Sequence, residues 1–115
     1  MRLKSEIWVK AYIRRCAVSG GAAFVVRRGD DAAGSIFIRV NRLDGTSTLF
    51  GPAAAGLETA EVERRWSIRL GHDPKPDQDI DAYMAREISF DPDVWVIEVE
   101  DREGRHFLDD WLAED

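Results

Sequence analysis

The residues of this chain that could support catalysis are carboxylates, two histidines and one cysteine. Asp93 stands just before a strand-like run that carries Glu98 and Glu100 on one face, a pattern that could hold Mg²⁺ for hydrolysis. A nuclease-like site of this kind also needs a positioned nucleophile. The lysine that would orient the attacking water two residues after the second acid is replaced by Glu100. A metal-assisted hydrolase using these three acids is therefore an alternative and not the leading hypothesis.

Carboxylates at alternate positions in residues 77–81 match the start of a calcium-binding loop. The rest of the loop is missing, because Ala82 stands where the sharp turn requires glycine and Ile88 stands where a bidentate glutamate is required. We predict that this acidic segment is the start of a helix, where carboxylates favour the positive end of the helix dipole.

His72, His106 and Cys16 do not form a recognisable catalytic set. A general base needs an imidazole within hydrogen-bond distance of an acid, and no Gly-x-Ser-x-Gly nucleophile motif is present. Cys16 falls on the apolar stripe of the first predicted helix, so we expect a buried packing residue. We expect no catalytic residue, metal or cofactor, which favours a protein that is not an enzyme without excluding a hydrolase.

Basic side chains near the N-terminus give the one argument for nucleic-acid or partner contact: Lys4, Lys10, Arg14 and Arg15. Phosphate contacts would require these side chains to share one surface. The acidity of the whole chain opposes nonspecific binding, and no helix-turn-helix, zinc-finger or aromatic RNA-binding pattern is present. Nucleic-acid binding is therefore a second alternative.

The composition fits one globular domain spanning residues 1–115, with 44% hydrophobic residues and a formal net charge of -6. Residues 1–57 hold nine basic and four acidic side chains, whereas residues 58–115 hold seven basic and 18 acidic. We expect part of this asymmetry to cancel across strands, with Arg39, Arg65 or Arg69 facing Glu98 or Glu100. The apolar runs are too short to span a bilayer, so we expect a cytoplasmic protein without membrane contact.

Hydrophobic periodicity and turn residues predict the elements that must position these groups. We expect helices over residues 5–18 and 79–89, a short final helix near residues 106–112, and strands over residues 22–28, 35–42, 46–50, 62–70 and 94–100. The 29–34 loop is predicted to close a hairpin. Asp44 and Gly45 predict a second hairpin with a two-residue type I′ turn.

The order of these elements predicts an α+β domain. We expect a mainly antiparallel sheet of about five strands, with the N-terminal helix and the two later helices packed on one face. The connection before the last strand is long enough for either a parallel or an antiparallel strand. The four tryptophans are expected in the core.

Three segments carry a resemblance to a known family: RLKSEIWVKAY at residues 2–12, FDPDVW at 90–95 and EVEDREGRHF at 98–107. Together they resemble a family of small alphaproteobacterial proteins described only as a domain of unknown function. The resemblance covers nearly the whole chain and implies a bacterial cytoplasmic protein. It implies no activity, substrate or catalytic residue.

The leading hypothesis is a small, non-catalytic protein-interaction or regulatory module. Its basis is the lack of a catalytic set together with the uneven charge distribution. The expected partner is another protein, and a homo-oligomer formed through an exposed edge strand is a further possibility.

Overall fold

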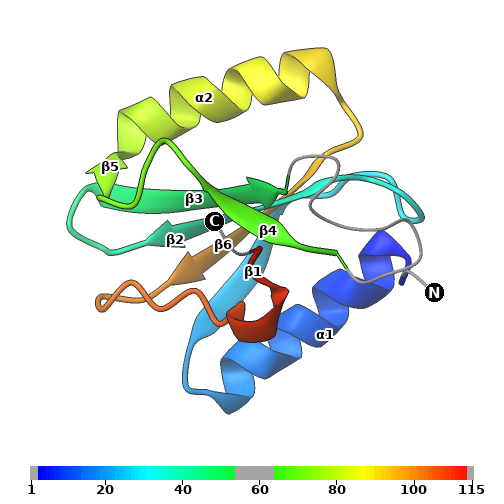
Figure 1. The fold of residues 1–115 in the computed structure, drawn as a ribbon, viewed down its shortest axis with the longest axis horizontal. Coiled ribbons are helices and arrows are strands. Elements are labelled where there is room, and N and C mark those ends of the chain that lie inside the picture. Colours follow the sequence, from blue (N-terminus) through cyan, green and yellow to red (C-terminus); the bar gives the residue numbers. More distant parts are fainter. Residues whose placement is uncertain (1–2, 54–63, 114–115) are drawn as a thin grey trace.

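The computed structural model describes residues 3–53 and 64–113. In chain order the elements are the helix α1 (Ser5–Val18), the strands β1 (Ala22–Arg27), β2 (Ile36–Asn41), β3 (Thr46–Pro52), β4 (Trp66–Arg69) and β5 (Lys75–Pro76), the helix α2 (Asp77–Phe90), the strand β6 (Trp95–Glu100) and the 3-10 helix η1 (Asp109–Trp111) (Figure 1). The α+β class is confirmed. The two-residue β5 was not predicted, and residues 62 and 63 of the expected fourth strand lie outside the described residues.

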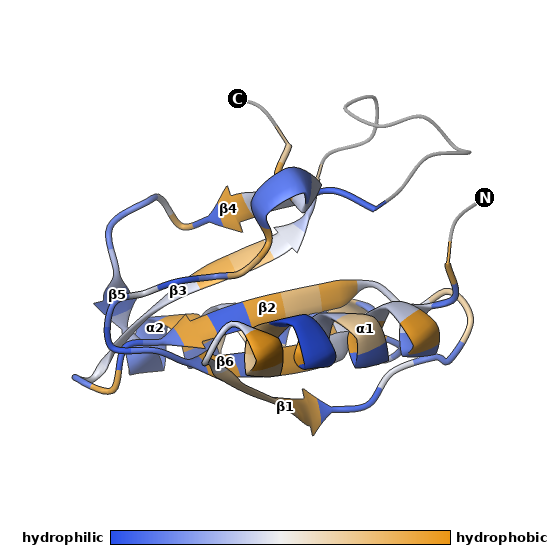
Figure 2. Ribbon diagram, turned by 90° about the horizontal axis from the view of Figure 1, so that it is seen from below, coloured by the Kyte–Doolittle hydropathy of each residue, from blue (hydrophilic) through white to orange (hydrophobic). Residues whose placement is uncertain are grey.

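The last strand, β6, lies inside the sheet, which has the order β1-β6-β2-β3-β4 with β5 paired to β3 (Figure 2). It runs antiparallel to β1 and parallel to β2, so the direction left open by the sequence is now known. The predicted hairpin between the first two strands is wrong, because β6 separates them. Val96 and Ile97 are both buried on opposite faces of β6, and a strand that is apolar on both faces belongs inside a sheet.

The two long helices cover opposite faces of the sheet (Figure 1). Trp8 and Tyr12 of α1 pack on one face, and Ile80 and Met84 of α2 pack on the other. The prediction of helices on a single face is therefore wrong. The physical reason lies in residues 36–38 of β2, which are all buried and apolar and so require cover on both sides.

An aromatic stack joins α1 to β4 and to the C-terminal segment, which comprises residues 101–113 after β6. The ring centroid of Trp8 lies 4.2 Å from that of Trp66 and 4.9 Å from those of Tyr12 and Trp111. Trp8, Trp66 and Trp95 are buried as predicted, whereas Trp111 is half-buried. This stack holds α1 against the sheet and gives the C-terminal segment an apolar surface to pack on.

The C-terminal segment forms only the single turn η1 in place of the expected short helix. Phe107 and Asp109 have positive φ angles of 56° and 41°, a conformation that interrupts a right-handed helix. The hydroxyl of Tyr12 donates a hydrogen bond to the carbonyl oxygen of His106 at 2.5 Å, which ties this irregular segment to α1.

The hairpin between β2 and β3 is confirmed, but its loop differs from the predicted type I′ turn. Positive φ angles occur at Leu43 and Gly45 and not at Asp44. The side chain of Asn41 accepts a hydrogen bond from the N–H of Leu43, and that of Asp44 accepts one from the N–H of Thr46. These side-chain acceptors stabilise the loop over residues 42–45, whose conformation the hydrophobic pattern of the strands does not predict.

Removing the link between α1 and the C-terminal segment should weaken the fold. We expect Tyr12→Phe to lower the free energy of unfolding by about 1 to 2 kcal/mol, because the carbonyl of His106 loses a partly buried donor. Urea unfolding measures the loss, and amide exchange should accelerate in the C-terminal segment. Tyr83→Phe on the other face is the control and should leave exchange in that segment unchanged; equal acceleration in both variants would contradict the link.

Candidate functional site

The acids proposed for metal-assisted hydrolysis do not converge. Asp93 precedes β6, whereas Glu98 and Glu100 lie in its second half. At a rise of about 3.3 Å per residue, the seven steps from Asp93 to Glu100 span roughly 23 Å. Among residues 3–53 and 64–113, no three His, Cys, Asp or Glu side chains form a group suited to a metal ion. The arrangement therefore gives the hydrolase hypothesis no geometric support.

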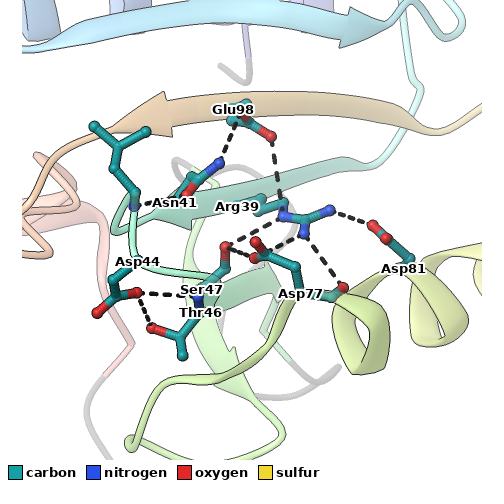
Figure 3. Close-up of polar contacts among 9 residues, drawn as sticks. Arg39, Asn41, Asp44, Thr46, Ser47, Asp77, Asp81 and Glu98 are labelled. Atoms are coloured by element: carbon teal, nitrogen blue, oxygen red, sulfur yellow. Dashed lines mark hydrogen bonds and ion pairs between the residues drawn. The ribbon is translucent and has the colours of Figure 1, made fainter.

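Glu98 belongs instead to an ion-pair cluster centred on Arg39 of β2 (Figure 3). The Arg39 guanidinium lies 3.0 Å from Asp77 and 3.9 Å from Glu98, and it also pairs with Asp81. Ser47 donates a hydrogen bond to Asp77 at 2.6 Å. The predicted pairing of Arg39 with Glu98 is confirmed, and the acidic segment at residues 77–81 is the start of α2, as predicted.

The electrostatics of this cluster favour ionised side chains. Burial opposes ionisation of Asp77, but hydrogen bonds from Ser47 and Arg39 outweigh it and lower the pKa of the carboxyl. Burial also opposes the charge on Arg39, but its acidic partners Asp81 and Asp77 raise the pKa of the guanidinium above its ordinary value. The cluster joins α2 to β2, β3 and β6, so its chemistry is structural.

The basic residues expected to form a contact surface lie on α1 or directly before it: Lys4, Lys10, Arg14 and Arg15. Because successive helical residues are rotated by about 100°, Lys10 and Arg14 align while Arg15 faces another side. The Arg15 guanidinium stacks 3.9 Å from the centroid of Trp111, and Lys10 lies 3.5 Å from Glu6. The four side chains therefore do not form one uniform basic face.

Both histidines line a single cavity of about 250 Å³ between the C-terminal segment and strands β3 and β4. Arg42 and Thr48 also line it, and so do apolar side chains that include Phe50. The Nδ1 atom of His106 accepts a hydrogen bond from the N–H of Leu108 at 2.9 Å, so the neutral ring carries its proton on Nε2. Burial lowers the pKa of His106, which keeps the ring neutral near pH 7.

One edge of the sheet is apolar and has no strand beside it among the described residues. Phe24, Val25 and Val26 of β1 are 42%, 42% and 56% exposed. The register with β6 places Phe24 on the α2 side and Val25 on the α1 side of the sheet. β1 is therefore apolar on both faces, which is unusual for an edge strand whose outer side is exposed to solvent.

Cys16 is fully buried on α1, as predicted, and burial raises the pKa of its thiol. A protonated, enclosed thiol is a packing group and a poor nucleophile. No helix among the described residues has the length and apolar character needed to cross a membrane.

Comparisons with known proteins identify a family but no activity. The model of a family described as "Protein of unknown function (DUF1491)" matches residues 3–109. A crystal structure of a DUF1491 family protein from Caulobacter crescentus is 39% identical, with a TM-score of 0.78, over 99% of this chain and 100% of that one. A solution structure of an A. tumefaciens protein is 41% identical, with a TM-score of 0.79, over 93% of this chain and 92% of the other. No curated protein matches the chain.

The half-buried position of Arg39, whose side chain is 14% exposed, should make its loss costly. We expect Arg39→Gln to lower the free energy of unfolding by about 2 kcal/mol, because Asp77 loses a charged hydrogen-bond donor. Arg28→Gln is the matched control, since Arg28 also meets two acids but is 58% exposed, and exposed pairs contribute little. Chemical denaturation compares the two variants, and equal losses would rule out a special role for the cluster.

The lowered pKa of His106 should make the fold less stable in mild acid. The unfolded chain binds a proton near the ordinary value of 6.5 while the folded state resists it, so stability is lost as the pH falls below that value. We expect the melting temperature to fall between pH 7 and 5.5. His106→Asn keeps an acceptor for Leu108 but does not titrate, so it should flatten this dependence; an unchanged slope would contradict the assignment.

Proposed function

We propose that this chain, which belongs to the DUF1491 family of proteins of unknown function, is a cytoplasmic, non-catalytic protein-interaction module that pairs an extended segment of a partner protein with the edge of β1. The observation that carries the proposal is the contrast between the two edges of the sheet. The β4 edge is partly covered by the C-terminal segment, whereas the β1 edge offers an apolar strand to solvent.

The C-terminal segment pairs with the first residue of the β4 edge. Trp66 forms a parallel bridge with Leu112, and its carbonyl oxygen accepts a hydrogen bond from the N–H of Ala113 at 2.8 Å. No described residue gives β1 a comparable neighbour on its outer side. An uncovered edge strand presents main-chain donors and acceptors that an incoming strand can satisfy.

The side chains of β1 define the chemistry of the partner. Phe24 and Val25 offer apolar contacts on alternate faces, so the added segment should be extended and carry apolar side chains on both faces. A shift of register between Val25 and Arg27 marks a bulge in the pairing with β6. The regular part of the edge is therefore residues 22–25, which limits the docked segment to a few residues.

The alternatives draw less support from the geometry. A hydrolase lacks converging acids among the described residues. Nucleic-acid binding would need one continuous basic face, whereas Arg15 stacks on Trp111 and Lys10 is close to Glu6. The protein-interaction module uses the surface that the fold leaves exposed and apolar.

Val25→Lys tests the proposed edge, because an edge lysine disfavours strand addition. The wild-type and variant proteins would be used to capture partners from an alphaproteobacterial lysate, and the captured protein would then be purified. We expect Val25→Lys to reduce its binding about tenfold or more, equivalent to roughly 1.4 kcal/mol. In the wild-type complex, amide exchange should slow within residues 22–25.

Leu70→Lys is the matched control, because Leu70 is 40% exposed at the opposite edge, beyond β4. It should bind as the wild type does. Equal loss in both variants, or a complex without slowed exchange in β1, would refute strand addition at this edge.

A further inference from the structure

We propose that the cavity between the C-terminal segment and strands β3 and β4 is a binding site for a small organic carboxylate, with Arg42 as its anion-binding residue. This site lies on the α1 face of the sheet and is separate from the β1 edge. The inference does not depend on the proposed protein-interaction function.

Arg42 lies in the wall of the cavity, next to the turn that follows β6. Its guanidinium lies against Gly104, where an added Cβ would be only 1.9 Å from Nη1. Gly104 also has a φ of 76°, a conformation that favours glycine. The turn that follows β6 is thus shaped to leave room for a guanidinium at the cavity wall.

No acidic side chain among the described residues forms an ion pair with Arg42. The exposed Asp44 in the same loop interacts with the charge of Arg42 through space, but hydrogen bonds from Thr46 contribute more to lowering the pKa of its carboxyl. Asp101 lies in the same turn as Gly104, but its carboxylate is occupied by Arg105 at 2.8 Å. Arg42 is half-buried, and a partly desolvated guanidinium gains from an anionic partner. A carboxylate fits because its two oxygens match the two parallel N–H groups of guanidinium.

His106 and Thr48 line the cavity beside this charge, as do the polar residues Ser67 and His72. The neutral ring of His106 has its proton on Nε2, because Nδ1 accepts the N–H of Leu108, and no described residue accepts a hydrogen bond from Nε2. The hydroxyl of Thr48, a residue that is 8% exposed, can donate or accept. These groups suit a second oxygen of the ligand and add no positive charge.

The rest of the cavity wall is apolar and therefore favours a ligand with an apolar group. Phe50, Trp66 and Leu112 line it. The volume of about 250 Å³ lies just below the range of roughly 300 to 1,000 Å³ typical of ligand pockets. A ligand with one ring or a short alkyl chain and one carboxylate therefore fits better than inorganic phosphate, which would leave the apolar wall without contact.

An NMR titration of the full chain with benzoate, phenylacetate and hexanoate tests the inference. We expect at least one carboxylate to shift the amide signals of residues that line the cavity, and to bind at least tenfold more tightly than its neutral amide or than inorganic phosphate. The site would be excluded if none of the three carboxylates shifted these signals. If the neutral amide bound as tightly as the carboxylate, the role assigned to Arg42 would be wrong. If phosphate bound as tightly as the carboxylate, the role assigned to the apolar wall would be wrong.

Arg42→Gln should weaken binding of the preferred carboxylate about tenfold or more, because it removes the charge. Arg14→Gln on the exposed surface of α1 is the matched control and should leave affinity unchanged. Arg42→Lys provides a second variant if Arg42→Gln does not fold, and it should retain part of the affinity because the charge remains. Unchanged affinity in a folded Arg42→Gln protein, or equal loss in Arg14→Gln, would overturn the assignment.

Discussion

The arrangement of this fold depends on burying both faces of β6. Trp95, Ile97 and Val99 of β6 face α1, whereas Val96 and Val94, the residue just before the strand, face α2. If either face of the strand were left uncovered, large apolar side chains would be exposed to water. The strand therefore takes a central position, with one helix on each side. Its insertion separates β1 from β2 and sends β1 to the edge. The two-sided layer arrangement and the exposed apolar strand therefore have one physical origin.

Polar and aromatic contacts then fix the positions of α2 and of the C-terminal segment on the two faces of the sheet. On the α2 face, Arg39 joins elements that are distant in sequence through three carboxylates. On the α1 face, the aromatic stack and the hydroxyl of Tyr12 hold the C-terminal segment across the sheet. His106, Leu112 and Ala113 of this irregular segment line the cavity proposed as a ligand site.

Local patterns in the sequence predicted the elements but not their arrangement. The alternation of apolar residues over residues 35–42 predicted β2, and the helical spacing of apolar residues over residues 5–18 predicted α1. The structure has both elements close to these bounds. The position of β6 was missed because pairing partners are set by burial across the whole sheet. Arg42 follows Ile36, Ile38 and Val40 at the same two-residue spacing, so the sequence alone indicates that a charged residue lies on the same face, at the end of this apolar row. Its closeness to Gly104 and His106 depends on long-range packing that spacing does not encode.

The central place of the last strand also has a consequence for the order of folding. During synthesis, β1 to β4 leave the ribosome before β6, so the apolar edges of β1 and β2 that β6 will join have no partner at that stage. The β2–β3 hairpin can form early because its strands are adjacent in sequence, but the complete sheet requires contacts between distant parts of the chain. The nascent protein therefore passes through a stage with two unpaired, aggregation-prone strand edges. Insertion of β6 is the step that ends this exposure, which makes the final third of the chain the part that commits it to the native sheet.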